Sequence, residues 1–218
     1  MKKSATNEIR VFIADDHAIA RQGIKMILSL ASDFNILGEA EGGHEVLEKI
    51  LSMDNVDVLL MDIEMPGKNG WDVLQELKSL RPKLPILVLS IFPEEHYGAR
   101  FLKAGAAGYL SKASTPEEIV SAIRRVSKGG KFVSPDLAEK LLFDLGKDNE
   151  KLLHENLSDR EFQVLGLIAS GKKIKAIAEE LSVGITTISS YRARILEKMG
   201  MKTNAELIHY ALKNKIIS

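Results

Sequence analysis

Short apolar runs alternate with amphipathic segments along the first 130 residues. Four continuous runs predict buried strands, and they are Ile9 to Ala14, Asp57 to Asp62, Leu84 to Leu89 and Ala107 to Leu110. Five segments repeat apolar residues at helical spacing, and they are Ala18 to Leu30, Glu45 to Leu51, Asp72 to Leu80, Glu94 to Ala104 and Pro116 to Val126. Strands that are apolar throughout indicate a sheet covered on both faces. Five alternating strand and helix units therefore predict a doubly wound α/β fold with a five-stranded parallel sheet.

A different pattern begins after Asn156, where the chain becomes helical throughout. Ser158 and Glu161 form a capping-box pair, which predicts a helix from Asp159 to Ala169. Three more helices follow: one carrying Ile174, Ile177, Ala178 and Leu181, one from Ile185 to Lys198 after a turn at Ser182 to Gly184, and one from Asn204 to Lys213. A helix, a short turn and a second helix are the outline of a helix-turn-helix, although many small helical bundles share it.

A short connector joins the two patterns. Gly129-Gly130 closes the fifth unit, and Ser134-Pro135 predicts an N-cap followed by a helix that runs to about Phe143. The polar stretch 146–150 follows this helix. We therefore expect three parts, an α/β domain at 1–130, a helical connector at 131–156 and an all-α domain at 157–218.

The composition is that of an ordinary globular protein, with 45% hydrophobic and 28% charged residues among 218. The absence of cysteine excludes disulfides, thiolate metal sites and cysteine nucleophiles. The N-terminus lacks the apolar core of a signal peptide, and no window approaches the roughly 18 apolar residues of a membrane span, so we expect a cytoplasmic protein without a membrane partner.

The net charge of zero is unevenly distributed along the chain. From Lys151 onward, 11 Lys and Arg stand against 7 Asp and Glu, a net charge of +4. The totals of 30 and 30 leave 19 against 23 before that point, a net charge of −4. The C-terminal part therefore has the sign of charge that nucleic-acid binding requires.

Polar residues stand at the ends of the predicted strands. Asp15 and Asp16 follow the first strand, Asp62 ends another, and Ser90 and Lys112 follow two more. A single aspartate in such a place often only caps the next helix. Parallel strands, however, present their carboxyl ends at one edge of the sheet, where open α/β folds place their sites. We therefore expect these five residues to converge at that edge.

The three carboxylates predict a metal ion. Carboxylates gathered at neutral pH repel one another and raise each other's pKa unless a cation lies among them. Oxygen ligands without His or Cys favour Mg²⁺, which keeps several waters and takes one or two carboxylates together with a phosphate oxygen. Lys112 would add a second positive charge and Ser90 a hydroxyl donor. The set describes a pocket for a phosphoryl group attached to Asp62.

With these motifs in order, residues 8–130 resemble the receiver domain of two-component response regulators, which has a flavodoxin-like fold. The resemblance implies that a sensor histidine kinase phosphorylates Asp62. It implies that Asp15, Asp16 and Asp62 hold Mg²⁺. It also implies that the main-chain carbonyl of Glu64 completes the metal shell.

The same resemblance implies a switch around the phosphoryl group. The Asp62 carboxylate would attack phosphorus in line, while Mg²⁺ and Lys112 neutralise the charge on the transferring group. Ser90 would then move inward to donate a hydrogen bond to the phosphoryl group. Tyr109 would rotate into the space that Ser90 leaves, so that a local charge changes a distant surface.

The surface of the third C-terminal helix distinguishes a DNA-binding motif from a helical bundle without such a function. At about 100° per residue, Ile188, Ile195 and Met199 share one stripe and must face the core. The opposite stripe holds Thr186, Ser189, Ser190, Ala193 and Glu197, flanked by Thr187 and Arg194. Small polar residues beside arginine can approach base edges and phosphates closely. A surface helix without such a function would more often be rich in Glu and Lys.

Residues 157–218 resemble the LuxR-type helix-turn-helix of the NarL/FixJ response regulators. The matching pieces are Leu157 to Glu161, Val164-Leu165, Leu167 to Gly171, Lys175 to Ala178, Leu181, Thr187 to Ser189 and Lys198 to Gly200. The resemblance implies that the third helix enters the major groove of double-stranded DNA. The implied base contacts are Ser189, Ser190 and Ala193, and the implied phosphate contacts are Thr187, Arg192, Arg194 and Lys198. It further implies homodimers that pair through the last helix, around Ala205 to Ala211.

Three residues depart from the family pattern. Ile174 replaces a common Asn, Gly184 a common Ser or Thr cap, and Asn204 a common Arg. Glycine still serves as an N-cap at a cost of a few tenths of a kcal/mol. Ile174 and Asn204 each remove a plausible contact with the DNA backbone, so we expect the departures to affect DNA affinity more than the fold.

Two alternative functions compete with a phosphorylation-controlled transcription regulator. The chain resembles haloacid-dehalogenase-like phosphatases in having an acid, Glu64, two residues after the candidate nucleophile, but Met65-Pro66 does not fit that pattern and the early acid pair would be unexplained. We therefore expect no enzymatic turnover of phosphate esters. The second alternative is a regulator that binds DNA without phosphorylation and uses its receiver as a dimer scaffold.

Overall fold

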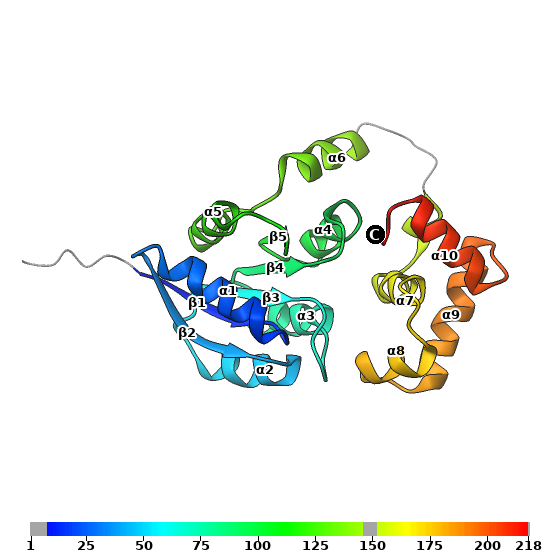
Figure 1. The fold of residues 1–218 in the computed structure, drawn as a ribbon, viewed down its shortest axis with the longest axis horizontal. Helices are drawn as coiled ribbons and strands as arrows, with labels where there is room; N and C mark the ends of the chain where they lie inside the picture. The colour runs from blue at the N-terminus through cyan, green and yellow to red at the C-terminus, as the bar shows by residue number, and fades with distance from the viewer. Residues whose placement is uncertain (1–7, 146–151, 218) are drawn as a thin grey trace, which may run out of the picture.

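The computed structural model describes residues 8–145 and 152–217, so the polar stretch expected at 146–150 lies outside the described residues. Figure 1 shows an α/β part and a helical part side by side. The strands are β1 (Ile9–Ala14), β2 (Phe34–Ala40), β3 (Val58–Asp62), β4 (Ile86–Ser90) and β5 (Gly108–Ser111). The helices of this part are α1 (Ala18–Ser29), α2 (Gly43–Ser52), α3 (Gly70–Leu80), α4 (Glu94–Lys103) and α5 (Pro116–Ser127).

The five strands form one parallel sheet in the order β2-β1-β3-β4-β5, which confirms the predicted fold class. Strand β2, at one edge, was not found from the sequence. Its residues are mostly half-buried, and only Ala40 is fully buried. An edge strand of mixed polarity gives no continuous apolar run, so the pattern that identified the central strands could not identify it.

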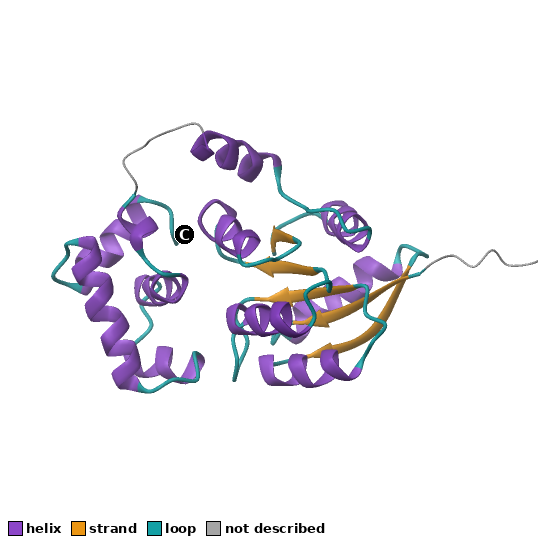
Figure 2. Cartoon of the chain, turned by 180° about the vertical axis from the view of Figure 1, so that it is seen from behind, coloured by secondary structure: helices purple, strands orange, loops and turns teal. Residues whose placement is uncertain are grey.

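Alternate residues of the central strands face opposite layers of helices, which are visible from behind in Figure 2. Val11 and Ile13 pack with Leu60 in a cluster that α1 and α5 cover. Phe12 and Met61 belong to a second cluster, on the face that α2, α3 and α4 cover. Because both faces are covered, every residue of β3 and β4 is buried.

Several predicted ends were wrong by one or two residues. Strand β4 begins at Ile86, after Pro85, and not at Leu84. Helix α3 begins at Gly70 and not at Asp72, because the side chain of Asn69 accepts hydrogen bonds from the main-chain N–H groups of residues 71 and 72 and caps the helix two residues earlier. Only glycine fits at residue 70, where a Cβ would lie 2.4 Å from the main-chain oxygen of residue 62.

The connector begins with a helix, α6 (Pro135–Leu145), at the place that the sequence predicts. Its first turn is anchored by Leu137, which is 1% exposed and lies against Gly98 of α4. A short 3-10 helix, η1 (Leu153–Asn156), precedes the helical part and was not predicted. Among the described helices, none combines the length and apolar character needed to cross a bilayer.

The helical part contains α7 (Asp159–Ala169), α8 (Ile174–Glu180), α9 (Ile185–Met199) and α10 (Asn204–Lys213). The Ser158 capping box forms as predicted. Ile188, Ile195 and Met199 are buried, which confirms the inward stripe of α9. The helix ends at Gly200, whose left-handed φ of 65° explains why glycine stops it there.

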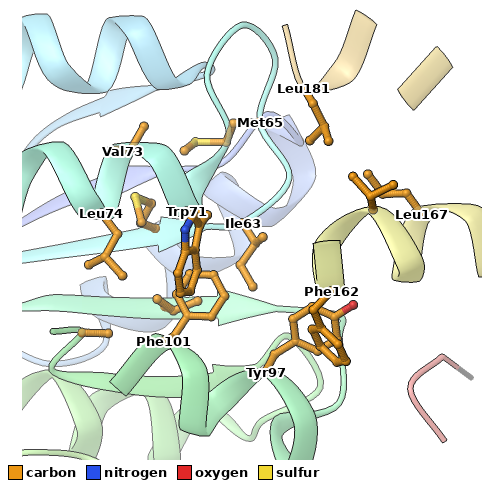
Figure 3. Close-up of a cluster of buried hydrophobic side chains, with 14 of the residues drawn as sticks. Ile63, Met65, Trp71, Val73, Leu74, Tyr97, Phe101, Phe162, Leu167 and Leu181 are labelled. Atoms are coloured by element: carbon orange, nitrogen blue, oxygen red, sulfur yellow. The ribbon is translucent and has the colours of Figure 1, made fainter. Parts of the chain in front are cut away.

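The α/β part and the helical part share one hydrophobic cluster (Figure 3). Trp71 meets Phe101 edge to face, with ring centroids 4.9 Å apart. Tyr97 of α4 contacts Phe162 of α7 at a centroid distance of 4.9 Å. The contact between α4 and α7 therefore connects the core of the α/β part directly to the core of the helical part.

Candidate functional sites

Four of the five polar residues predicted to gather at the carboxyl edge of the sheet form a buried or half-buried group. Asp15, Asp62 and Ser90 are 1%, 4% and 0% exposed, and Lys112 is half-buried. Lys112 is placed by its own main chain, because its N–H donates to the carbonyl oxygen of Ser90 at 2.8 Å. Asp16, the fifth, is exposed at the rim.

Lys112 connects the two buried carboxylates. Its Nζ donates to Oδ2 of Asp62 at 2.7 Å and forms an ion pair with Oδ2 of Asp15, also at 2.7 Å. Burial raises the pKa of Asp62 to about 6, because the opposing effect of Lys112 does not fully offset it and Asp15 adds to the rise. Burial lowers the pKa of Lys112, but its bonds with Asp15 and Asp62 outweigh this, so that the pKa is raised.

The acidic residues could hold a hard cation. Ligand atoms of Asp15, Asp16, His17 and Asp62 all lie within 4.8 Å of one another. Oδ2 of Asp15 is buried and lies 2.7 Å from Nζ of Lys112, so the cation would join a site that already binds one positive charge. Three carboxylates that outnumber the single lysine beside them form an oxygen-rich donor set, which fits Mg²⁺.

His17 stands next to these carboxylates, and sequence analysis did not consider it a site residue. Its Nδ1 lies 2.7 Å from Asp16 and 3.4 Å from Asp15, although its side chain is 66% exposed. Its main-chain N–H donates to Oδ1 of Asp15 at 2.8 Å. The sequence gives one indication that His17 belongs to the site, which is its position directly after the acid pair. Position alone, however, does not predict the direction in which a side chain points.

Ser90 and Tyr109 meet at Phe92. The Oγ of Ser90 accepts a hydrogen bond from the N–H of Phe92 at 3.1 Å, and the hydroxyl of Tyr109 donates to its carbonyl at 3.0 Å. Tyr109 is fully buried, so its ring already occupies the interior position. The ring of Phe92 stacks on Tyr97 with centroids 4.7 Å apart. Tyr97 in turn contacts Phe162 in the helical part, so the switch candidates connect to the second domain.

The side chain of Glu64 points to the helical part. Lys172, which follows α7, donates to its Oε1 at 3.1 Å and to Glu180 at 2.9 Å. A second ion pair joins Asp72 of α3 to Arg160 at 3.0 Å, and here too the acid belongs to the α/β part and the base to the helical part. These ion pairs between domains were not predicted, because their members stand about 90 to 110 residues apart.

Arg100 of α4 makes the densest contact between the domains. Its guanidinium lies 4.3 Å from the ring centroid of Phe162, a cation–π contact. It also donates to the carbonyl oxygens of Leu157 and His154, at 3.1 and 2.9 Å, and to the carboxylate of Asp159 at 2.7 Å. One side chain therefore fixes both the start of α7 and the end of the connector on the receiver surface.

Five of the seven predicted DNA contacts lie in one exposed row on α9, and they are Thr187, Ser189, Ser190, Ala193 and Arg194. The other two are engaged within the helical part. Arg192 donates to Asn204 at 2.6 Å, and Lys198 donates to the buried Glu161 at 2.6 Å. The described receiver residues do not cover the exposed row.

Two family models match the chain, one to each part. Residues 11–124 match the response regulator receiver domain. Residues 155–211 match the bacterial regulatory proteins of the luxR family.

Curated relatives match over nearly the whole length. The response regulator UvrY of Escherichia coli is 34% identical over 207 residues, 94% of each chain. The oxygen regulatory protein NreC of Staphylococcus aureus is 36% identical over 216 residues, which cover 96% of this chain and 99% of NreC.

Solved structures of the RcsB response regulator of Salmonella typhimurium are also similar. One has a TM-score of 0.77 at 28% identity and covers 97% of this chain and 100% of RcsB. Another, of RcsB bound to a promoter in the presence of the phosphomimetic BeF₃⁻, has a TM-score of 0.72 at 28% identity and covers 94% and 98% of the two chains. The similarity therefore includes both parts of the chain.

Proposed function

Because this chain belongs to the NarL/FixJ family of response regulators, which join a receiver domain to a LuxR-type DNA-binding domain, we propose that phosphorylation of Asp62 controls its binding to double-stranded DNA. One observation carries the assignment: Asp62 is a buried carboxylate at a strand end, within 2.7 Å of Lys112. The proposed domains are the receiver at 1–130, the connector at 131–156 and the DNA-binding domain at 157–218.

The chemistry follows from the residues at the edge of the sheet. An oxygen of Asp62 attacks the phosphorus of a phosphohistidine on the sensor kinase; the new O–P bond forms as the N–P bond breaks, and the histidine nitrogen keeps the electron pair. Lys112 donates to an oxygen of the transferring group and lowers the cost of its charge. Mg²⁺, held by Asp15, Asp16, Asp62 and the main-chain carbonyl of Glu64, supplies further charge neutralisation when bound.

The phosphoryl group would break the local hydrogen bonds at Ser90. It adds roughly −1.5 to −2 charge and strong acceptor oxygens. The Ser90 hydroxyl can then donate to a phosphoryl oxygen. As it moves, its Oγ gives up the hydrogen bond that it now accepts from the N–H of Phe92. Tyr109 holds the carbonyl of Phe92, so the two switch residues act on one peptide segment. The stack of Phe92 on Tyr97 carries the change to the contact with Phe162.

A second route to the DNA-binding domain runs through Glu64. Its main chain lies two residues after Asp62, while its side chain binds Lys172 of the helical part. A displacement of this loop on phosphorylation therefore acts on an ion pair between the domains. We propose that phosphorylation loosens the contacts at Glu64 and Tyr97 and promotes homodimers through the helix around Ala205 to Ala211.

The exposed row of α9 supports DNA binding through the major groove. The receiver part is little more than half of the chain, so TM-scores of 0.77 and 0.72 require that both parts superpose together on RcsB. One of these RcsB structures is bound to a promoter, which fits a domain arrangement that leaves α9 accessible. We propose a cytoplasmic location, because a regulator of this kind must reach DNA.

The side-chain partner of Glu64 argues against a phosphatase. A general acid or base for ester hydrolysis must lie within hydrogen-bond reach of the reacting group. Oε1 of Glu64 instead pairs with Lys172. We therefore propose that sustained turnover of small phosphate esters does not occur.

The test compares wild type with Asp62→Asn, in the presence and absence of acetyl phosphate and Mg²⁺. DNA footprinting and sedimentation report DNA binding and dimerisation. We expect the phosphodonor to change both in wild type and neither in Asp62→Asn. Asp54→Asn, at an exposed aspartate of the preceding loop, is the control and should behave as wild type. Identical DNA affinity and dimerisation in both proteins would favour the scaffold alternative.

A further inference from the structure

Arg21 of α1 is a buried cation that reaches the loop carrying the acid pair. The residue is 6% exposed. Its Nη1 donates to the main-chain carbonyl of Asp15 at 2.7 Å. Its Nε donates to Glu39 at 3.2 Å, and its Nη2 donates to Glu41. A buried guanidinium is stable only when it is paired and hydrogen-bonded, so these contacts fix its orientation.

The positive charge of Arg21 is neutralised by the acidic side chains next to it. Two carboxylates, Glu39 of β2 and Glu41 just beyond that strand, face the guanidinium. Lys25, one turn further along α1, shares Glu39 at 3.1 Å. Because the guanidinium is matched by two acids, it adds little net field at the acidic site. Any effect on that site must come from geometry.

The carbonyl that Arg21 holds belongs to the peptide between Asp15 and Asp16. The N–H of Asp15 donates to the carbonyl of Ala40 at 3.1 Å, and its carboxylate accepts from the N–H of His17. Arg21 is therefore the side chain that holds the carbonyl end of Asp15, and with it the plane of the next peptide. The orientation of this plane sets the direction in which the Asp16 carboxylate leaves the main chain.

We propose that Arg21 is a positioning residue for the metal site: it holds the peptide between Asp15 and Asp16 so that both carboxylates can face one Mg²⁺. The proposal rests on the proposed function, which supplies the ion. Arg21 itself contacts neither the metal nor the phosphoryl group. Residues that orient metal ligands in this way commonly change metal affinity by about 10- to 100-fold when they are replaced.

Three variants separate positioning from charge and from stability. Arg21→Met removes the guanidinium, and Arg21→Lys keeps its charge without the planar fork that reaches three acceptors. Lys25→Met is the matched control, because Lys25 lies on the same helix and binds the same Glu39 but does not touch Asp15. Titration calorimetry with MgCl₂ measures the affinity of each full-length protein.

We expect both Arg21 variants to raise the Kd for Mg²⁺ by about 10-fold and Lys25→Met to change it by less than about twofold. Phosphorylation by acetyl phosphate should need more Mg²⁺ for half-saturation and should reach the wild-type maximum when Mg²⁺ is saturating. In metal-free protein, the amide of His17 should exchange with solvent faster, while the amides of β3 keep their wild-type rates.

An unchanged Mg²⁺ affinity in folded Arg21→Lys would overturn the proposal, as would an equal loss in Lys25→Met. If Arg21→Met does not fold, Arg21→Lys decides alone. Faster exchange throughout the protein would identify a merely structural role. If wild type itself does not bind Mg²⁺, the metal of the proposed function is wrong, and the exchange of the His17 amide in metal-free protein still decides whether Arg21 holds this loop.

Discussion

The proposed phosphoryl acceptor lies in surroundings that oppose its own charge. The pKa of Asp62 is raised to about 6, mainly by burial, which Lys112 opposes and to which Asp15 adds. The carboxylate is thus destabilised in the metal-free protein, and a cation or a covalent phosphoryl group relieves that cost. A nucleophile held in this way is prepared for the ligands that the site is proposed to take.

The raised pKa predicts how stability depends on pH. Between pH 6 and 4 the native protein holds a proton on Asp62 that the unfolded chain, with a pKa near 3.8, does not hold as tightly. The unfolding free energy of the metal-free wild type therefore rises, relative to Asp62→Asn, as the pH falls through this window. Above about pH 7, Asp62→Asn should be more stable by about 1–3 kcal/mol.

Urea unfolding of both proteins at a series of pH values from 4 to 8 measures this difference. The series repeated with saturating Mg²⁺ is the control, because the ion should remove the advantage of Asp62→Asn. A stability difference that does not vary with pH would show that burial does not perturb Asp62.

At the scale of single elements, α9 combines an inward apolar stripe with an exposed row of small residues. Thr187, Ser189, Ser190 and Ala193 leave room for the helix to approach base edges, and Arg194 lies exposed beside them. Asn204 stands where the family commonly has Arg. Its Oδ1 accepts a hydrogen bond from Nε of Arg192 at 2.6 Å. This hydrogen bond keeps the Arg192 side chain against the protein surface. It must break before Arg192 can reach a DNA phosphate.

Replacement of Arg194 tests the role of α9. We expect Arg194→Ala to weaken binding to all DNA sequences similarly and to lower the slope of log affinity against log salt by roughly one, because one phosphate contact is lost. Fluorescence anisotropy over a range of salt concentrations measures both effects. Lys128→Ala, which removes an exposed charge at the end of α5, is the control. If neither quantity changes in Arg194→Ala, α9 does not face the DNA backbone there.

At the scale of the whole molecule, the two domains meet over an apolar contact surrounded by ion pairs. Tyr97 and Phe162 form its centre, and Glu64 and Asp72 pair with Lys172 and Arg160 at its edge. These pairs are half-buried at the edge and still reach water, so each contributes little stability, about 0–1 kcal/mol. The aromatic contact therefore carries most of the attraction, and the ion pairs fix its register.

Gly166 of α7 offers a way to open this interface without touching the phosphorylation site. A Cβ at this position would lie 2.3 Å from the Tyr97 hydroxyl oxygen, so the buried Tyr97 side chain or α7 must shift. We expect Gly166→Ala to increase the radius of gyration in small-angle scattering. We also expect DNA affinity in this variant to become independent of acetyl phosphate.

Gly23→Ala is the matched control, because a Cβ at Gly23 of α1 meets nothing within 4 Å. Alanine is intrinsically better than glycine in a helix by about 1 kcal/mol, so both variants gain from this effect and only Gly166→Ala meets a clash. If Gly166→Ala remains compact and still responds to the phosphodonor, the contact between Tyr97 and α7 does not couple the domains.

The sequence by itself determined the parallel sheet, the helices of both domains and the group at the sheet edge. Central strands are apolar throughout because helices cover both faces, and parallel strands end at one edge, so Asp15, Asp62 and Lys112 had to be neighbours. Caps such as Ser158 are equally local, because their partners lie within one helical turn. These features depend on spacing, which a sequence displays directly.

Only the tertiary structure decided which side chains meet across long separations. Arg21 binds Glu39 of β2, an edge strand that no apolar run revealed. Glu64 turns to Lys172, 108 residues away. Lys198, which the sequence predicts to contact DNA, donates to the buried Glu161 in this structure. Periodicity fixes the face on which a residue lies, but the direction of a long charged side chain depends on the opposite charges that folding brings within reach.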